Sequence, residues 1–276
     1  MIFFELQGRL GNQIFQIVFL SLMKKEFGET SILIDRNSDD YNLDLFEVDF
    51  RRELNPLNTI SSFLIRMRNM VVPYMKLNKE SCLDEYTPSK IYINSNLSGY
   101  FQTGNYYLKH KDWVSLLLKI NQKYKAEFDA KYGQVFRDNQ ILTIHVRRGD
   151  YATTIFSEIN SNALIPFSWF ESVFRSIPTA KYDKIFIVSD CVDELLIDSF
   201  FLNIGASFEV NSVEVDFQLI MNSDIAIISN SSFAWWASFL NPKLDKKIYA
   251  PYNWVGYNAG LEYPKGIMIE DFLWVK

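Results

Sequence analysis

The second half of the chain alternates short apolar runs with segments whose apolar residues recur at helical spacing. The run at residues 141–144 (ILTI) is rich in β-branched residues and predicts a buried strand. Further elements are expected as helices at 166–177, 192–201, 213–221 and 233–240 and as strands at 184–188, 206–210, 225–228 and 247–250. Strands that alternate with helices predict an α/β fold with a parallel sheet covered on both faces.

The first half begins in the same way and then loses its regularity. Residues 2–6 predict a strand, a loop with two glycines follows, and residues 13–27 have apolar residues at helical spacing. The remaining elements are expected as a strand at 31–35, a helix at 58–70 within the irregular region 36–90, a strand at 91–93 and a helix at 113–132.

The length of 276 residues suits one large or two ordinary domains. Residues 133–140 form the expected seam, which divides the chain into an N-terminal half, residues 1–135, and a C-terminal half, residues 136–276. The sequence shows neither an internal repeat nor a low-complexity linker.

Composition narrows the classes of function. A formal net charge of −5 argues against a general nucleic-acid binder, so any anion site must be a local concentration of arginine. Two distant cysteines form neither a metal pattern nor a disulfide framework, which favours a reducing compartment. Apolar runs are too short to span a membrane, and the first residues lack the basic flank of a signal peptide. A cytoplasmic protein is expected, with at most peripheral contact at the inner face of the membrane.

Candidate chemistry begins directly after the apolar run at 141–144, in the segment HVRRGDY at residues 145–151. In open α/β sheets, ligands bind outside the carboxyl ends of the strands. Arginine is the side chain best suited to fork onto a phosphate group. This segment is therefore the first candidate for an anion site.

Alternation along an extended strand assigns sides to this segment. If the strand persists, His145 and Arg147 share one side, and Arg148 lies on the other side and supports the loop. Gly149 permits a sharp turn, and Asp150 places a carboxylate beside the positive charge. The alternative is a plain Arg–Asp ion pair at a strand end.

A second anion element follows the strand at 225–228, in the segment SNSSF at residues 229–233. The hydroxyl groups of Ser231 and Ser232 and the amide near Phe233 could hold a phosphate at a helix N-terminus. The alternative is an ordinary helix cap, because serine is a favoured cap residue.

Two carboxylates complete the candidate set in this half. Asp216, near the start of a helix, can accept two hydrogen bonds from a guanine edge, or it simply favours a helix N-terminus. Asp190 follows the strand at 184–188 and is counted with the candidate site residues. Glu214 and Asp216 resemble an acidic metal pair, but the chain has no D-x-D motif, and a diphosphate beside Arg147 needs no cation. No metal is expected.

The N-terminal half offers two weaker motifs. Residues 7–12 (QGRLGN) join a strand to a helix, which is typical of the first unit of a nucleotide-type fold or of any tight turn. Residues 99–102 (GYFQ), with Tyr106 and Tyr107 close behind, either line a sugar site or belong to the core.

Together these motifs resemble the bacterial α-1,2-fucosyltransferases of glycosyltransferase family 11. The matching segments, in family order, are GRLGNQ with Phe15 and Gln16, GYFQ, HVRRGDY and SNSSFAWW. Ala234 stands where the family often has serine. Residues 36–90 match nothing in this pattern and are expected to govern the choice of acceptor.

The resemblance implies a GT-B-like fold, in which two Rossmann-type halves face each other across a cleft and the N-terminal half is the acceptor side. The donor would be GDP-β-L-fucose, a substrate used with inversion and without any cofactor. The implied donor site consists of Gly11, Asn12, His145, Arg147, Arg148, Asp190, Asp216, Ser231, Ser232 and Phe233. Within it, Arg147 binds the diphosphate, His145 and Asp216 bind the guanine edge, and residues 231–233 hold the β-phosphate.

The implied mechanism follows from the charges. Negative charge grows on the leaving GDP, so Arg147 and the helix N-terminus attract it more strongly in the transition state. Asp150 is the nearest candidate base for the attacking acceptor hydroxyl. An aspartate beside two arginines is a weak base, so Asp150 either takes the proton or only orients Arg147 or Arg148.

The expected acceptor is a β-linked galactose in a surface glycan such as an O-antigen, free or lipid-linked. Two alternatives stay open: a GDP-sugar transferase with a different deoxyhexose or linkage, and a non-catalytic module that binds a nucleotide or glycan.

Overall fold

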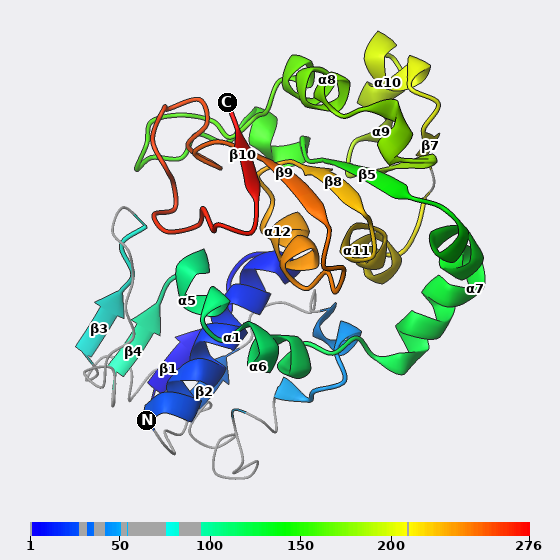
Figure 1. Ribbon diagram of the computed structural model, residues 1–276. Coiled ribbons are helices and arrows are strands. Elements are labelled where there is room, and N and C mark those ends of the chain that lie inside the picture. The colour runs from blue at the N-terminus through cyan, green and yellow to red at the C-terminus, as the bar shows by residue number, and fades with distance from the viewer. Residues whose placement is uncertain are drawn as a thin grey trace. The chain divides into compact units, whose positions relative to one another are not determined.

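The computed structural model describes residues 2–27, 32–35, 42–50, 54, 76–82, 95–208 and 210–276. The chain divides into two compact units, Met1–Asn121 and Gln122–Lys276. Each unit contains one sheet in which all neighbouring strands are parallel (Figure 1). The expected α/β class with parallel sheets is confirmed.

The sheet of the N-terminal unit has the strand order β2-β1-β4-β3. Its strands are β1 (Ile2–Glu5), β2 (Ile32–Asp35), β3 (Lys76–Lys79) and β4 (Ser95–Ser98). The strands β3 and β4 were not predicted, because KLNK and SNLS lack the apolar run that marks a buried strand. The helix expected at 58–70 and the strand expected at 91–93 lie outside the described residues.

Helices complete this unit. Helix α1 (Leu10–Phe27) follows β1, as the apolar spacing predicted. Shorter helices are η1 (Asn42–Leu45), α5 (Gly104–Leu108) and α6 (Lys111–Leu117). Phe101 stacks on Phe19 of α1 with ring centroids 4.0 Å apart and contacts Phe4 of β1 at 5.8 Å. This aromatic contact joins the sheet, the helix and the loop after β4.

The C-terminal unit begins with α7 (Gln122–Asp138), which runs through most of the expected seam. The helix expected at 113–132 is divided into α6 and α7. Tyr132 and Phe136 of α7 each contact Phe186 with ring centroids 5.6 Å apart. The structure therefore divides the chain after Asn121 rather than after residue 135, because aromatic packing fastens α7 to the second sheet.

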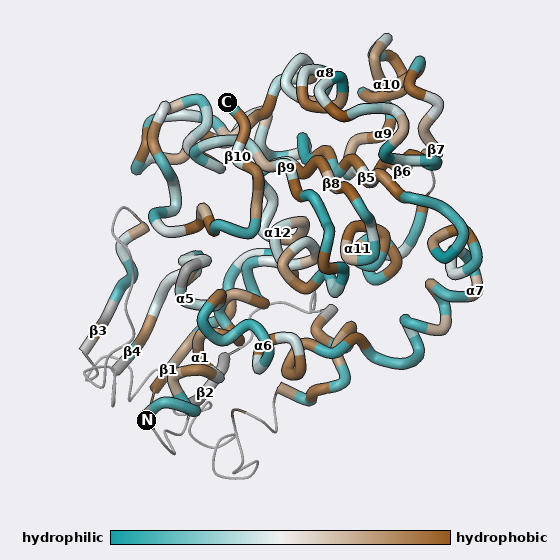
Figure 2. The backbone as a smooth tube through the Cα atoms, in the orientation of Figure 1, coloured by the Kyte–Doolittle hydropathy of each residue, from teal (hydrophilic) through white to brown (hydrophobic). Residues whose placement is uncertain are grey.

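The second sheet has the strand order β10-β9-β8-β5-β6-β7. Its strands are β5 (Ile141–Val146), β6 (Lys184–Ser189), β7 (Ser207–Phe208), β8 (Ile225–Ile228), β9 (Lys247–Pro251) and β10 (Leu273–Val275). Figure 2 shows hydrophobic residues concentrated along the central strands. The strand at 247–250 was expected to be the last, but β10 follows it. Trp169 holds β10 by donating from Nε1 to the carbonyl of Val275 at 3.2 Å.

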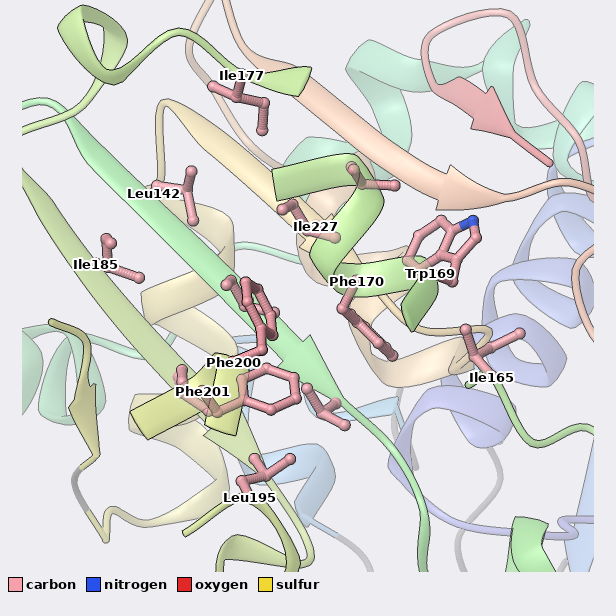
Figure 3. Close-up of a cluster of buried hydrophobic side chains, with 14 of the residues drawn as sticks. Leu142, Ile165, Trp169, Phe170, Ile177, Ile185, Leu195, Phe200, Phe201 and Ile227 are labelled. Atoms are coloured by element: carbon pink, nitrogen blue, oxygen red, sulfur yellow. The ribbon is translucent and has the colours of Figure 1, made fainter. Parts of the chain in front are cut away.

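Alternate residues of β5 face opposite layers. Leu142, Ile144 and Val146 join an apolar cluster under the helices α8 (Phe167–Ser176), α9 (Val192–Leu195) and α10 (Ser199–Asn203) (Figure 3). Thr143 contacts the hydroxyl of Ser223, which follows α11 (Val213–Met221) on the other face. The expected helix at 192–201 is divided into α9 and α10, because Asp198 caps α10 by accepting from two backbone N–H groups.

In each sheet the order of the strands reverses at the first strand of the unit, because later strands are added on its other side. In the second unit the chain passes from β5 outward to β6 and β7, then returns to the other side of β5 with β8. In the first unit β2 lies on one side of β1, and β4 lies on the other. Ligands of open α/β sheets bind at such switch points, outside the carboxyl ends of the strands. The loops after β1, β4, β5 and β8 are therefore the candidates, and they carry the four sequence motifs.

None of the helices in the described part of the chain is long and apolar enough to cross a membrane. Neither Cys82 nor Cys191 forms a disulfide bond in the described part of the chain.

The aromatic contact between α7 and β6 predicts a stability effect. We expect Phe186→Ala to lower the free energy of unfolding by about 3 kcal/mol or more, because two rings lose their partner and a cavity is left. Urea denaturation of the whole chain measures this change. The control is Leu244→Ala, at a side chain that is 99% exposed, where the change should stay within about 0.5 kcal/mol. An equally small effect at Phe186 would contradict the assignment of α7 to the second unit.

Candidate functional site

The hydroxyl of Ser229 joins the ends of the strands β5 and β8. The register pairs His145 with Ile228, so both strands leave the sheet at one edge. Ser229 Oγ lies 2.9 Å from His145 Nδ1 and accepts from the backbone N–H of Arg147 at 3.1 Å. Its own N–H donates to the carbonyl of His145 at 3.0 Å. Ser229 was not among the predicted site residues, although a hydroxyl placed directly after a buried strand was a signal for it.

His145 is a neutral side chain in this setting. Burial lowers the pKa of His145 to about 3, and the charge of Arg147 lowers it in the same direction. Ser229 Oγ accepts from Arg147 and has a hydrogen of its own, so it can donate to Nδ1; in that tautomer the imidazole proton is on Nε2. His145 can therefore donate a hydrogen bond through Nε2 without carrying a charge.

Arg147 is held between two carboxylates. Its guanidinium pairs with Asp150 and, through Nη1, with Asp190 Oδ2 at 2.6 Å. The guanidinium also lies over the ring of Tyr151, 5.5 Å from the centroid. The predicted alternative of an Arg–Asp ion pair is thus present, but it is part of a larger cluster at the edge of the sheet.

Arg148 lies on the side of α8 and α9, as the alternation predicted. Its guanidinium pairs with Glu194 of α9 and lies over the ring of Phe167, 4.2 Å from the centroid. Its backbone N–H donates to Asp190 Oδ1 at 3.0 Å. In this arrangement Arg148 supports the loop, and direct binding of a ligand by its side chain stays a prediction.

Gly149 lets the loop pass close to Asp190. Its φ angle is +26°, and a Cβ atom at this position would lie 2.5 Å from Asp190 Oδ2. A larger residue would be strained and would also push on the carboxylate that holds Arg147.

The N-terminus of α12 (Ser232–Phe239) follows Ser229 directly. Ser231 is the N-cap residue, yet within the described residues its hydroxyl caps no backbone N–H of the helix. Phe233, in the first turn, contacts the ring of His145 at 6.0 Å and the ring of Phe217 at 5.3 Å. The helix start, the end of β5 and the start of α11 thus meet around one ring, and the ordinary-cap alternative lacks its hydrogen bond.

Asp216 lies in the first turn of α11, next to Phe217. It accepts from Asn211 Nδ2 at 3.1 Å, while Asn211 Oδ1 accepts from Lys131 Nζ at 2.7 Å and from the hydroxyl of Tyr132 at 2.8 Å. Burial raises the pKa of Asp216 to about 6, against the opposing effects of the Asn211 hydrogen bond and the Lys131 charge. This carboxylate therefore titrates close to neutral pH.

In the N-terminal unit, two glutamines hold the glycine loop between β1 and α1. Gln13 donates from Nε2 to the carbonyl of Gly8 at 2.7 Å. Gln16 makes two hydrogen bonds of 3.0 Å with the backbone of Gln7, one as donor and one as acceptor. Gly8 has a φ angle of +75°, and Gly11 lies in the first turn of α1. The spacing of the GRLGNQ motif is thus explained by the turn itself.

The GYFQ motif is fastened by a residue that sequence reasoning missed. Glu80 accepts from the backbone N–H groups of Tyr100 and Phe101, both at 2.6 Å. Gln102 then donates from Nε2 to Asn12 Oδ1 at 2.8 Å, which joins this motif to the glycine loop. Phe101 and Tyr107 are completely buried, so these two aromatic residues belong to the core.

In the described part of the chain, no three His, Cys, Asp or Glu residues are placed to hold a metal ion together.

The sequence model of Glycosyl transferase family 11 matches residues 1–259. The O-antigen biosynthesis glycosyltransferase WbnK of Escherichia coli is 27% identical, with 92% of this chain and 94% of that protein covered. The alpha-1,2-colitosyltransferase of Escherichia coli is also 27% identical, with 86% of each chain covered.

Among solved structures, that of NodZ alpha-1,6-fucosyltransferase soaked with GDP-fucose has a TM-score of 0.51 to this chain. It is 16% identical, and the match covers 87% of this chain and 92% of that one. The expected GT-B-like fold is confirmed by this likeness.

The raised pKa of Asp216 predicts that its charge costs stability. Because the pKa of this carboxyl is raised in the folded state, the folded protein loses stability as the pH rises from the ordinary pKa of the group toward about 6. We therefore expect Asp216→Asn to raise the free energy of unfolding by about 1–2 kcal/mol at pH 7, with the difference vanishing near pH 4.

Chemical denaturation at both pH values measures this difference. The control is Asp138→Asn at the exposed end of α7, which should change stability little at either pH. A variant at position 216 that is less stable than the parent at pH 7 would contradict the prediction.

Proposed function

This chain belongs to glycosyl transferase family 11, and from that membership we propose that it transfers L-fucose from GDP-β-L-fucose to the 2-hydroxyl of a β-galactoside. The reaction forms an α-1,2 linkage with inversion and uses no metal ion. The observation that carries the proposal is the cluster at the switch point of the second sheet. There Ser229 joins His145 to Arg147 directly in front of the N-terminus of α12.

Arg147 and the start of α12 are assigned to the diphosphate. A guanidinium and the free N–H groups of a helix N-terminus both favour negative charge. As the C1–O bond breaks, the charge on GDP grows and both groups attract it more strongly. Ser231, Ser232 and the amide of Phe233 are assigned to the β-phosphate, which is consistent with a Ser231 hydroxyl that caps no N–H group.

Asp216 and His145 are assigned to the guanine edge. An ionised carboxylate can accept from guanine N1–H and from the amino group, and a neutral imidazole can donate from Nε2 to the guanine carbonyl. The pairing of Phe233 with both His145 and Phe217 gives the two groups a common support. Arg148 and Asp190 complete the set in this unit, and by the resemblance to the family Gly11 and Asn12 of the N-terminal unit stay expected donor contacts.

The proposed acceptor is a galactose-containing unit of a surface glycan, free or lipid-linked. One relative is an O-antigen biosynthesis glycosyltransferase, which supports an acceptor of this class. The proposal includes a cytoplasmic location with at most peripheral contact at the inner face of the membrane. Two cysteines that form no disulfide bond are in keeping with this location, and the net charge of −5 is in keeping with the absence of a nucleic-acid partner.

A second candidate has the same chemistry with another donor. The second relative is an alpha-1,2-colitosyltransferase, so a different GDP-linked deoxyhexose is the leading alternative to fucose. Competition between GDP-fucose and GDP-colitose for a limiting amount of protein distinguishes the two donors.

The direct test is mass spectrometry of the protein incubated with GDP-fucose and lactose or N-acetyllactosamine in the presence of EDTA. We expect a product heavier by one deoxyhexose, in undiminished yield. Arg147→Ala should lower the rate of transfer at least about a hundredfold, because it removes charge stabilisation of the leaving group. The matched control is Arg175→Ala, which removes an exposed arginine from an ion pair on α8. Near-normal activity of the Arg147 variant would overturn its assignment, and tight GDP binding without turnover would favour the binding module.

The assignment of Asp216 predicts a pH dependence. Below its pKa of about 6 the carboxyl is protonated and loses an acceptor for the guanine edge, so the affinity should fall with falling pH. We expect the Kd for GDP-fucose to rise about tenfold from pH 7 to pH 5. Isothermal titration calorimetry measures it with GDP-fucose, whose diphosphate has no group that titrates in this range.

The control for this measurement is Asp216→Asn, which should bind weakly at both pH values with little difference between them. A pH dependence that persists in this variant would assign the titration to another group.

A further inference from the structure

We propose that the two carboxylates on Arg147 have different tasks in transfer. Asp190 is a positioning residue that holds Arg147 throughout, whereas Asp150 leaves Arg147 when the diphosphate binds and then accepts the proton of the acceptor hydroxyl. The inference rests on the proposed function and adds a sequence of events to it: donor binding exposes the base.

Asp190 is fastened at both of its oxygen atoms. Oδ2 pairs with Arg147 Nη1 at 2.6 Å, and Oδ1 accepts from the backbone N–H of Arg148 at 3.0 Å. Gly149 closes the contact, because any Cβ there would lie 2.5 Å from Oδ2. A carboxylate with two fixed partners and a close backbone neighbour keeps its place, so the guanidinium that it holds keeps its place as well.

Asp150 is held quite differently. Its side chain is 50% exposed, compared with 27% for Asp190. Within the described residues no backbone N–H fastens its carboxylate, whereas its carbonyl oxygen accepts from the N–H groups of Thr153 at 3.2 Å and Thr154 at 2.9 Å. The backbone at Asp150 is therefore fixed while the carboxylate can turn away from Arg147 by a change of rotamer alone.

Charge decides which carboxylate yields. Arg147 carries one positive charge and already faces two negative ones, so a bound diphosphate would place further negative charge beside both. Like charges brought together at a binding site are costly. Exchange of the Asp150 carboxylate for a phosphate oxygen keeps the guanidinium hydrogen bonds filled and removes the repulsion. Asp190 cannot make this exchange without also losing the N–H of Arg148.

The exchange also frees the Asp150 carboxylate for the acceptor. While Asp150 is paired with Arg147, its Oδ1 is occupied by the guanidinium; once it is released, this oxygen can accept from the acceptor hydroxyl. In the transfer step the acceptor oxygen forms a bond to C1 of the sugar, and the acceptor proton passes to the Asp150 carboxylate. The bond from C1 to the β-phosphate oxygen breaks, and its electron pair stays on GDP. The acid form of Asp150 then returns its proton to solvent.

Opposite effects on GDP affinity test the two tasks. Calorimetry with GDP at pH 7.5 compares the full-length protein with Asp150→Asn and Asp190→Asn. The first variant removes a competing charge, so the Kd should fall, by up to about fivefold. The second frees the guanidinium, so the Kd should rise about tenfold. The two variants should also affect different kinetic constants of transfer. Asp150→Asn should lower kcat at least about a hundredfold, and Asp190→Asn should raise KM for GDP-fucose.

Two further variants distinguish an effect of displacing Asp190 from a general loss of folding. Gly149→Ala pushes on Asp190 without changing any charge and should weaken GDP binding in the same direction as Asp190→Asn. Glu171→Gln removes the carboxylate of an exposed arginine pair on α8 and should leave both GDP affinity and activity unchanged. Thermal denaturation of each variant shows whether it is folded under the conditions of the assay.

Equal directions of change in the two aspartate variants would overturn the inference, as would an Asp150→Asn variant with normal kcat. Wild-type protein that binds GDP and transfers fucose in either case would leave the proposed function in place. Wild-type protein that binds no GDP would overturn the proposed function, and this inference with it.

Discussion

The parallel pairing of β5 with β8 is the constraint on which the rest of the site depends. These strands are neighbours because the chain, after β6 and β7 on one side of β5, returns to place β8 on the other side. Their register pairs His145 with Ile228. The residues that follow must then leave the sheet side by side. The hydroxyl of Ser229 makes use of this by bonding both to the imidazole of His145 and to the N–H of Arg147. Main-chain pairing alone, without a ligand, thus brings together a cation, a neutral histidine and a helix N-terminus.

The N-terminal unit follows the same rule with different residues. Its glycine loop and its GYFQ segment follow the strands β1 and β4, which are neighbours at the switch point of the first sheet. Amide side chains take the place of the serine hydroxyl there, since Gln102 bonds to Asn12 across the two loops. Glu80 holds the GYFQ turn with a buried carboxylate, whose pKa is raised by burial and lowered by the two N–H groups that it accepts from. The four motifs thus form two pairs, and each pair follows the two neighbouring strands at which the strand order of one sheet reverses.

Elements that local sequence patterns encode could be predicted, whereas elements that exist only through pairing with a neighbour could not. The strands β5, β6 and β8 are continuous apolar runs and were predicted, as was the placement of the candidate site at their ends. The strands β3, β4 and β10 are short or polar and are strands only because a neighbour pairs with them. The extent of α7 depended on rings that contact Phe186, far away in the sequence. Ser229 and Glu80 act through partners that no spacing reveals, whereas Arg147, Asp150 and Asp216 could be proposed from the sequence because each places a charge next to the end of a strand or the start of a helix.

Several groups at this edge of the second sheet are held in states that folding alone would not favour. His145 is buried without charge, Asp216 is buried against its tendency to ionise, and one guanidinium faces two carboxylates. Perturbed pKa values and unbalanced charge of this kind concentrate at functional sites, where a ligand can supply the missing partners. A guanine edge would give Asp216 two hydrogen-bond donors, and a diphosphate would take the place of the Asp150 carboxylate on Arg147. The cost to the free protein and the proposed affinity for a nucleotide diphosphate would then be two consequences of the same arrangement of charges.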